Sequence, residues 1–316
     1  MTNATIASLL ACEHNPCLFY PAIKDVGYDM ADVLRDADKQ VEVLRYIEKN
    51  YIGGAVIRMT ELWCEGASFG LDVSFSNHDF PSLGDPLCED AEDLANIAIP
   101  DAVNAITAPL IQAVERAVPF MEKPLIVGIT GPYTLGAVLN GSEDFMCNCL
   151  SEEDLVFPFL DKLTDFLISY TLAYKQAGAS AVMIAEPSVA MISPDMMLFF
   201  SNAYIEKIIH AVADESFAVI YHNCGAVNPH LSNIATLPAD AFHFGNDVDL
   251  SKALALFSPD QIIMGNIDPQ HYITQKTPAL QTMHNTLHNA MSQHANFSLS
   301  TGCDLSPKAN VDIFRK

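Results

Sequence analysis

The chain has 316 residues, half of them apolar, and a formal net charge of −23 at pH 7. So acidic a surface repels nucleic acid and anionic membranes, which excludes both as partners, and the apolar half is ample for a large core. No run of about 18 uncharged apolar residues predicts a membrane span, and the N-terminus lacks the basic segment of a secretory signal. We therefore expect a cytoplasmic protein.

Short β-rich segments recur along the chain, each followed by a loop and then by a helix-patterned stretch. We predict eight strands, at Cys17–Ala22, Gly54–Met59, Leu125–Thr130, Ala181–Ala185, Phe217–Tyr221, Ala241–Gly245, Ile262–Ile267 and Phe297–Thr301. Eight strands that alternate with helices in a chain of this length are typical of a (β/α)8 TIM barrel, an α/β fold. A doubly wound open sheet is the alternative, but no Gly-x-Gly-x-x-Gly sequence follows an early strand.

The stretch from about residue 60 to residue 100 differs from the rest of the chain. It is rich in Gly, Pro, Asp and Ser, which predicts an inserted loop layer over the barrel mouth. The chain contains neither an internal repeat nor a linker, so we interpret residues 1–316 as a single barrel domain.

In a barrel, chemistry collects at the C-terminal ends of the strands, so the residues that follow each predicted strand are the candidates for function. In chain order they are Lys24; Arg58 with Thr60 and Glu61; Tyr133 in a Gly-Pro-Tyr-Thr loop; Glu186; His222 with Cys224; Asn246 with Asp247; Asn266 with Asp268; and Cys303 with Asp304.

The fifth and eighth strands together provide one histidine and two cysteines. His222 and Cys224 are two residues apart at the end of an apolar strand, so their side chains point the same way, and Cys303 follows the last strand. One imidazole and two thiolates in a tetrahedral shell suit Zn²⁺, and three firm ligands with one open position are typical of a catalytic site. Glu186 is a fourth ligand that swings away, a base for an incoming thiol, or a partner for a nearby polar group.

A zinc ion with two thiolate ligands is electron-rich and a modest Lewis acid. It is suited to binding a third thiol, from a substrate, and to holding it as a nucleophilic thiolate near neutral pH. Hydrolysis by zinc-bound hydroxide is the chemical alternative, but it usually uses shells of His and carboxylate.

Other residues with possible metal ligands are better explained by structure. His284 and His288 lie four apart on a helix without a third ligand, Cys147 and Cys149 are typical of helix packing, and His243 is typical of a core histidine. Asp247 and Asp249 either hold a zinc-bound histidine through hydrogen bonds or cap the next helix.

The His222-Asn223-Cys224 sequence and the distant Cys303, within TGCDLSP, resemble the uroporphyrinogen decarboxylase superfamily, in particular its zinc-dependent methylcobamide:thiol methyltransferases. The methylcobamide:coenzyme M enzymes of methylotrophic methanogens are the best-known members. The stretches GPYTLGAVLNGSEDFM at 131–146, HNCGAVNPHL and MGNIDP at 264–269 are similar in kind and order, so the likeness covers most of the chain.

The resemblance implies a TIM barrel with one zinc at its mouth, held by His222, Cys224 and Cys303, with Glu186 as a further candidate ligand. It further implies transfer of a methyl group from the methylcobamide of a corrinoid protein to a small thiol, with coenzyme M as the first candidate. Because the sulfonate of such a thiol needs a cation or amide donors, Lys24 and Arg58 are its candidate partners, or each simply pairs with an acid.

Tyr133 and Asn266 are further candidates for lining the pocket, and residues 60–100 and 131–146 are the expected contact surfaces for the corrinoid protein. The sequence also departs from the family. The decarboxylases carry an arginine-rich N-terminal segment that binds substrate carboxylates, whereas the first arginine here is Arg35. Only nine residues follow Ser306-Pro307, where relatives usually complete a longer helix. A uroporphyrinogen decarboxylase is therefore disfavoured.

We hypothesise that the thiol loses its proton at the open zinc position and that its thiolate attacks the methyl carbon on Co(III), so that Co(I) leaves. Two alternatives are open: a related methyltransferase with another acceptor, such as homocysteine, or with a place in a demethylation pathway, and a non-catalytic accessory barrel that binds zinc or a corrinoid.

Overall fold

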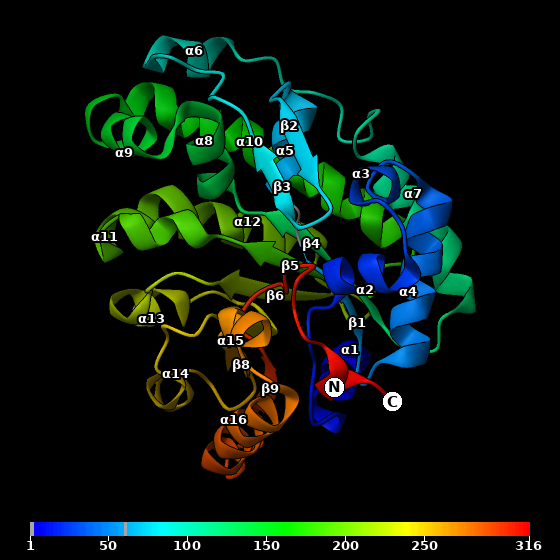
Figure 1. Cartoon of the computed structure of the whole chain (residues 1–316). Coiled ribbons are helices and arrows are strands. Elements are labelled where there is room, and N and C mark those ends of the chain that lie inside the picture. Colours follow the sequence, from blue (N-terminus) through cyan, green and yellow to red (C-terminus); the bar gives the residue numbers. More distant parts are fainter. Residues whose placement is uncertain (1–2, 60–61) are drawn as a thin grey trace.

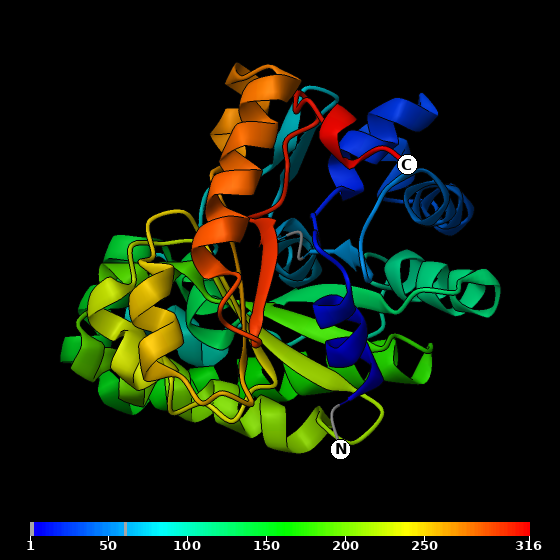
Figure 2. The same ribbon diagram turned by 90° about the horizontal axis from the view of Figure 1, so that it is seen from below.

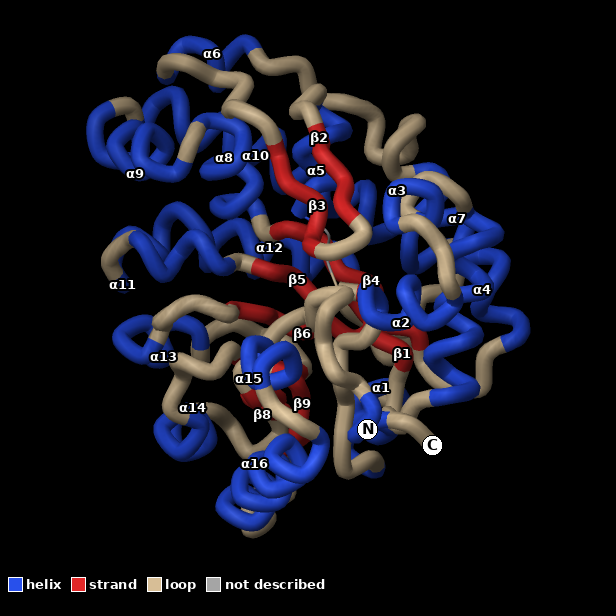
Figure 3. Tube along the Cα trace, in the orientation of Figure 1, coloured by secondary structure: helices blue, strands red, loops and turns tan. Residues whose placement is uncertain are grey.

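A curled sheet of parallel strands forms the centre of the molecule. The computed structural model describes residues 3–59 and 62–316. Within these ranges every neighbouring pair of strands in the central sheet is parallel. The strands, in their order in the sheet, are β1 (Val56–Arg58), β4 (Leu125–Thr130), β5 (Ala181–Ala185), β6 (Ala218–Asn223), β7 (Ala241–Phe244), β8 (Ile262–Ile267) and β9 (Phe297–Thr301). Helices lie around this sheet (Figures 1 and 3), which confirms the predicted TIM-barrel fold.

The helices follow the strands as βα units require. Their bounds are α1 (Ala4–Ala11), α2 (Phe19–Val26), α3 (Met30–Val33), α4 (Ala37–Asn50), α5 (Leu62–Phe69), α6 (Ala91–Asn96), α7 (Ala108–Ala117), α8 (Pro132–Asn140), α9 (Ser142–Ser151), α10 (Glu153–Gln176), α11 (Pro194–Met197), α12 (Ala203–Val212), α13 (Leu231–Ile234), α14 (Leu250–Leu256), α15 (Pro269–Thr274) and α16 (Thr277–Met291). A π-helix, Leu198–Asn202, joins α11 to α12.

The predicted first strand, Cys17–Ala22, is wrong, because most of it lies in helix α2. Its apolar residues suit a strand by composition, but Phe19, Tyr20 and Ile23 also fall at the spacing of one helical face, and all three are buried. Gly27 ends the helix with φ of 85°, and its N–H donates to the carbonyls of Ile23 and Lys24.

Asn15 occupies the place between β9 and β1, where an eighth strand would close the barrel. Its backbone N–H donates to Leu299 of β9 at 2.8 Å, and its side chain donates to Ser298 of β9 and to Leu9 of α1. Its Oδ1 accepts from the backbone of Gly54, just before β1. One fully buried amide therefore links the two edges of the sheet.

Helix α1 covers the N-terminal end of the barrel, and in Figure 2 it lies below the centre of the view, near the label of the N-terminus. Thr5 and Ser8 donate to the carbonyls of Ser180 and Gly54, which precede β5 and β1. Ile6 and Leu9 join the apolar cluster inside the barrel. Since this end is closed by a helix, the strand ends at the opposite face are the ones left for a site.

Side chains alternate along each strand between the barrel interior and the helical layer. Ala181 and Met183 of β5 and Ile220 of β6 belong to the interior cluster. Val182 and Ile184 belong to the larger core that packs beneath the helices. This alternation decides which of the strand-end residues can meet inside the barrel.

The predicted loop layer between residues 60 and 100 contains regular structure. It holds α5, the hairpin of β2 (Val73–Ser76) and β3 (Asp79–Leu83), and α6. Thr60 and Glu61 lie outside the described residues. The hairpin packs against α2 through the rings of Phe80 and Tyr20, and Asp79 forms an ion pair with Lys308 near the C-terminus.

None of the helices in the described ranges combines the length and the apolar character that a membrane-spanning segment requires.

Candidate metal centre

His222 and Cys224 stand at the C-terminal end of β6, and Cys303 stands just beyond β9. The pairing of His222 with His243 of β7 places the histidine ring on the interior side of the barrel. Extended backbone carries Cys224 to the same side. Gly245, just after β7, lies so close that a Cβ there would be 2.7 Å from the Cα of Cys224, so only glycine fits without movement.

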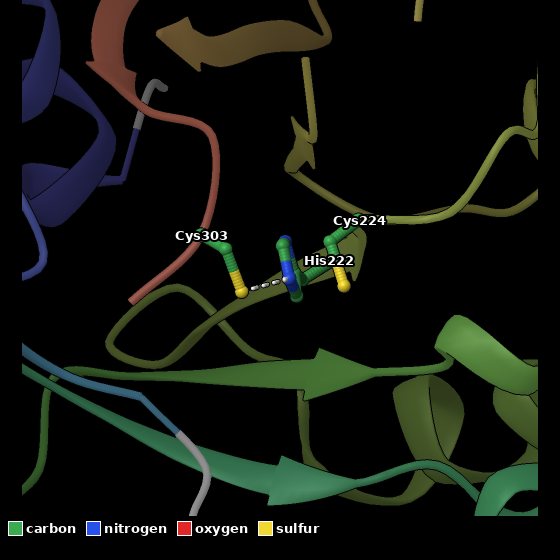
Figure 4. Close-up of side chains that lie close together, drawn as sticks. All are labelled: His222, Cys224 and Cys303. Carbon is green, nitrogen blue, oxygen red and sulfur yellow. Dashed lines mark hydrogen bonds between the residues drawn. The ribbon is translucent and has the colours of Figure 1, made fainter. Parts of the chain in front are cut away.

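The three side chains form a cluster suited to a metal ion (Figure 4). One ligand atom of each lies within 4.8 Å of the others, and among the described residues this is the one such group of three His, Cys, Asp or Glu side chains. The Nε2 atom of His222 and the Sγ atom of Cys303 are 3.6 Å apart. Tetrahedral Zn²⁺ with Zn–S bonds of about 2.3 Å and a Zn–N bond of about 2.05 Å separates N from S by about 3.6 Å. The donor set and its spacing therefore fit zinc.

The electrostatics of the cluster favour a thiolate. The pKa of Cys224 is lowered to about 4, because the hydrogen bond from the Cys303 thiol and the adjacent His222 ring together outweigh its burial. The pKa of Cys303 is raised well above its ordinary value, because its thiol donates to Cys224 and is itself buried. Without a metal the pair thus holds a single thiolate, and a divalent cation is what would allow both thiols to ionise.

The partners of His222 leave its Nε2 atom facing the cysteines. Its Nδ1 atom lies 2.7 Å from Nδ1 of His243 and 3.1 Å from the carbonyl oxygen of the same residue. The ring of His222 is 1% exposed, whereas Cys224 and Cys303 are partly exposed. Solvent, and hence a small ligand, reaches the cluster from the sulfur side.

Glu186 is not brought into the cluster. Its carboxylate is fully buried and accepts hydrogen bonds from the backbone N–H groups of Tyr133 and Thr134, at 2.9 and 2.8 Å, and from the Ser201 hydroxyl at 3.0 Å. Burial raises its pKa to about 7, although these hydrogen bonds act in the opposite direction. Of its three predicted roles, partner to nearby polar groups is the one that these contacts match.

Arg58 points away from the barrel mouth. Its guanidinium donates to Gln40 Oε1 at 2.8 Å, to the Leu110 carbonyl at 3.2 Å and to the Tyr174 hydroxyl at 2.9 Å, all in the helical layer. The side chain is 3% exposed. The structure therefore does not bring Arg58 together with the cysteines, and its predicted contact with a substrate has no support from its surroundings.

The remaining predicted residues lie in three different places. Lys24 is exposed on α2 and borders a cavity of about 260 Å³, which His78 and Pro307 also line. Tyr133 is buried in α8, with its ring against Phe145. Asn266 donates to two carbonyl oxygens in the loop after β7.

His243 is the residue that our sequence interpretation missed, because it assigned this histidine to the core. It is fully buried, as expected, but it contacts the His222 ring directly. Asp249, the alternative partner for a zinc-bound histidine, instead caps α14 by accepting from the N–H groups of Ser251 and Lys252. His222 and His243 are directly paired in the neighbouring strands β6 and β7. Placing the two predicted strands side by side in this register could have revealed the contact.

A parallel α/β barrel with a His–Cys–Cys cluster at its strand ends defines a TIM-barrel protein with a candidate metal centre. Residues 16–315 match the model of the Uroporphyrinogen decarboxylase (URO-D) family. The chain therefore belongs to that family, as its motifs predict.

Similar proteins include both uroporphyrinogen decarboxylases and a methylcobamide:CoM methyltransferase. A uroporphyrinogen decarboxylase of Cupriavidus metallidurans is 26% identical over 285 residues, which cover 82% of this chain and 75% of the relative. A methylcobamide:CoM methyltransferase of Methanosarcina mazei is 29% identical over 159 residues, which cover 50% of this chain and 46% of the relative. The solved structure of a methyltransferase from Methanosarcina mazei has a TM-score of 0.83 at 19% identity, with 98% of this chain and 95% of that chain covered, and so shares the fold.

Proposed function

We propose that this protein is a zinc-dependent methyltransferase that moves a methyl group from a methylated corrinoid protein to a small thiol, with coenzyme M as the first candidate. The observation that carries the proposal is the cluster of His222, Cys224 and Cys303 at the strand ends, in which one ligand atom of each residue lies within 4.8 Å of the others. Likeness to a methylcobamide:CoM methyltransferase over half of the chain supports the same reaction class.

Each side chain has a defined task in this proposal. His222, Cys224 and Cys303 hold the zinc, which would lower the pKa of a bound substrate thiol so that it is a thiolate near neutral pH. The substrate approaches from the sulfur side, where Cys224 and Cys303 are partly exposed. The sulfur lone pair then forms the S–CH₃ bond, and the electron pair of the Co–C bond stays on cobalt, which changes from Co(III) to Co(I).

A charged acceptor such as coenzyme M needs a partner for its sulfonate. Lys24 is exposed beside the hairpin of β2 and β3 and is the candidate that keeps this role, whereas Arg58 already has three buried acceptors. If Lys24 contacts the sulfonate, Lys24→Ala raises the KM for coenzyme M and leaves the KM for an uncharged thiol such as 2-mercaptoethanol unchanged.

The corrinoid protein would dock at the same face. The hairpin of β2 and β3 and the start of α8 are parts of the segments 60–100 and 131–146 that the sequence suggests as contact surfaces. A binding measurement with a corrinoid protein, on variants of exposed hairpin residues such as His78 and Asp79, tests this surface.

The function is tested by zinc analysis and zinc-edge X-ray absorption, with and without coenzyme M, followed by an assay of methyl transfer from methylcobalamin. We expect about one zinc per chain, three protein ligands and one additional sulfur ligand when the thiol is added. Absence of zinc from protein purified without chelators, or a shell that is indifferent to every thiol, contradicts the proposal.

Uroporphyrinogen decarboxylation is the second candidate, because a decarboxylase matches the chain at 26% identity over a larger share than the methyltransferase does. The opposing observation is the shortage of arginine for a substrate with many carboxylates. The first arginine, Arg35, lies with its guanidinium over the ring of Phe75, and Arg58 is buried in the helical layer. Incubation with uroporphyrinogen under reducing conditions decides between the two, and we expect no coproporphyrinogen.

Two other possibilities keep the same fold. An acceptor such as homocysteine, or a place in a demethylation pathway, would give methyl transfer with a different preferred thiol, and a panel of thiols in the methylcobalamin assay separates these from coenzyme M. An accessory barrel would hold zinc in a closed shell of four protein ligands, and thiol addition would then leave the X-ray absorption spectrum unchanged.

A further inference from the structure

His243 connects two parts of the cluster that are distant in the sheet. Its Nδ1 atom lies 2.7 Å from Nδ1 of His222 on β6. On the other side of its ring, Nε2 lies 2.8 Å from the carbonyl oxygen of Thr301 and 2.9 Å from the hydroxyl of Ser300, both on β9. Since β8 lies between β7 and β9 in the sheet, this ring reaches across the barrel interior beneath the cluster.

The direction of these hydrogen bonds follows from what the terminal groups can do. The Thr301 carbonyl can only accept. The Ser300 hydroxyl donates to the carbonyl of Asn15 at 2.6 Å, so its oxygen is left to accept as well. Both neighbours of His243 Nε2 are acceptors, and this nitrogen therefore carries the hydrogen.

The same reasoning extends to the candidate zinc ligand. A neutral imidazole with its hydrogen on Nε2 has a lone pair on Nδ1, so His243 accepts at Nδ1 from the Nδ1–H of His222. His222 then has its own lone pair on Nε2, the atom that lies 3.6 Å from Cys303 Sγ. This series of hydrogen bonds thus selects the tautomer of His222 that can bind a metal through Nε2, the atom that faces the cysteines.

We propose that His243 is a positioning residue of the metal centre: it sets the tautomer and ring orientation of His222 and ties that ring to the strand that leads into Cys303. The proposal rests on the proposed function only in placing zinc at His222, Cys224 and Cys303. His243 itself does not touch the metal.

A neutral acceptor in this position has a chemical consequence. Zn²⁺ with two cysteine thiolates has a net charge of zero, and a substrate thiolate brings it to −1. A carboxylate in place of His243 would bring a second negative charge into a fully buried position, which is costly in an apolar interior. An imidazole orients His222 without that charge and so leaves the centre able to bind an anionic thiolate.

The test compares His243→Leu with His243→Asn in measurements of zinc affinity by chelator competition and of the absorption spectrum of the Co²⁺-substituted protein. Leucine removes the imidazole acceptor and leaves His222 Nδ1 only its longer contact, 3.1 Å, with the backbone carbonyl of residue 243. We therefore expect zinc affinity to fall by about 10- to 100-fold, with altered Co²⁺ ligand-field bands. The Oδ1 atom of asparagine takes the place of Nδ1 as an acceptor for His222, so we expect this variant to recover most of the affinity and the wild-type spectrum.

Urea unfolding of the zinc-free proteins and a matched control separate positioning from general structure. His284→Leu removes another buried histidine, which is hydrogen-bonded to Tyr272 on α15, and we expect it to lower stability without changing zinc affinity. The inference is overturned if His243→Leu binds zinc as tightly as the wild type, or if His243→Asn loses as much affinity as His243→Leu. A wild-type protein that binds no zinc at all instead defeats the proposed function itself.

Discussion

The backbone N–H of Glu186 donates to the carbonyl of His222 at 2.9 Å, yet the two side chains lie on opposite sides of the sheet. The His222 ring lies in the barrel interior against His243, and the Glu186 carboxylate lies against the start of α8 and the π-helix. Two titratable groups on adjacent strands therefore belong to separate environments. The candidate metal centre therefore consists of His222, Cys224 and Cys303, and no carboxylate from the described residues joins it.

Replacement of one cysteine tests the ligand assignment. In Cys303→Ser the hydroxyl is a much poorer zinc ligand than a thiolate, so we expect zinc after dialysis to fall from about one per chain to below about 0.1. Cys147→Ser, which alters an exposed cysteine on α9, is the matched control and keeps its zinc. Metal analysis by mass spectrometry measures both, and retention of a full zinc by Cys303→Ser contradicts the assignment.

Arg58 gives a prediction about stability rather than substrate binding. In Arg58→Met the apolar stem is retained, but three buried acceptors, on Gln40, Leu110 and Tyr174, lose their donor. At about 1 kcal/mol or more for each acceptor, we expect the free energy of unfolding to fall by roughly 3 kcal/mol. The KM for coenzyme M should stay at the wild-type value, and a KM that rises while stability is unchanged would restore Arg58 as a substrate contact.

Much of the fold could be predicted because parallel strands that are buried on both faces produce compact apolar runs. Seven of the eight predicted strands overlap β1 and β4–β9. The alternation along those runs also contains information that the sequence interpretation left unused. Met183 of β5 faces the interior, so Glu186, three residues later, falls on the other side, as Arg58 does after Ile57 of β1.

The rest depends on contacts between residues far apart in the chain. His243 and Thr301 meet across the barrel, and Asn15 bridges two strand edges, and neither relationship leaves a local pattern in the sequence. The apolar run that contains Phe19 and Ile23 was ambiguous because a short apolar segment suits a buried strand and a buried helix equally. Only tertiary contacts decide whether such a segment forms a strand or a helix.

We expect the Asn15 side chain to stabilise the junction between β9 and β1, where the barrel closes. Asn15→Ala leaves the buried carbonyl of Leu9, the hydroxyl of Ser298 and the N–H of Gly54 without their side-chain partner. We expect a loss of about 2–4 kcal/mol in the free energy of unfolding, since each buried polar group left unpaired costs about 1–3 kcal/mol. Asn285→Ala, at an exposed position on α16, is the control. Equal urea midpoints for the two variants would show that the side-chain contacts of Asn15 contribute nothing to stability.

Glu186→Gln tests whether this carboxylate is a metal ligand. Because its three donors lie in α8 and the π-helix, away from the cysteines, we expect the variant to bind zinc with wild-type stoichiometry and affinity. Chelator competition provides the measurement. A loss of affinity comparable to that of Cys303→Ser would show that Glu186 swings toward the metal in solution.

Glu186 also predicts how stability depends on pH. Its pKa is raised from an ordinary value of 4.5 to about 7 in the folded protein, chiefly by burial, so the folded state holds a proton that the unfolded state has lost between these two values. The contribution of this group is therefore fully present below about pH 4.5 and is lost as the pH rises through about 7, with a total of about 3 kcal/mol.

The measurement compares the free energy of unfolding in urea for zinc-free wild type and Glu186→Gln across this pH window, so that loss of metal in acid does not contribute. Glutamine cannot titrate, and the stability of the wild type should fall relative to the variant as the pH rises. Other groups titrate equally in both proteins and cancel in the difference. A difference that is constant from about pH 4.5 to about pH 7 would mean that Glu186 is ionised in the folded protein throughout, and its hydrogen bonds from Tyr133, Thr134 and Ser201 would then outweigh its burial.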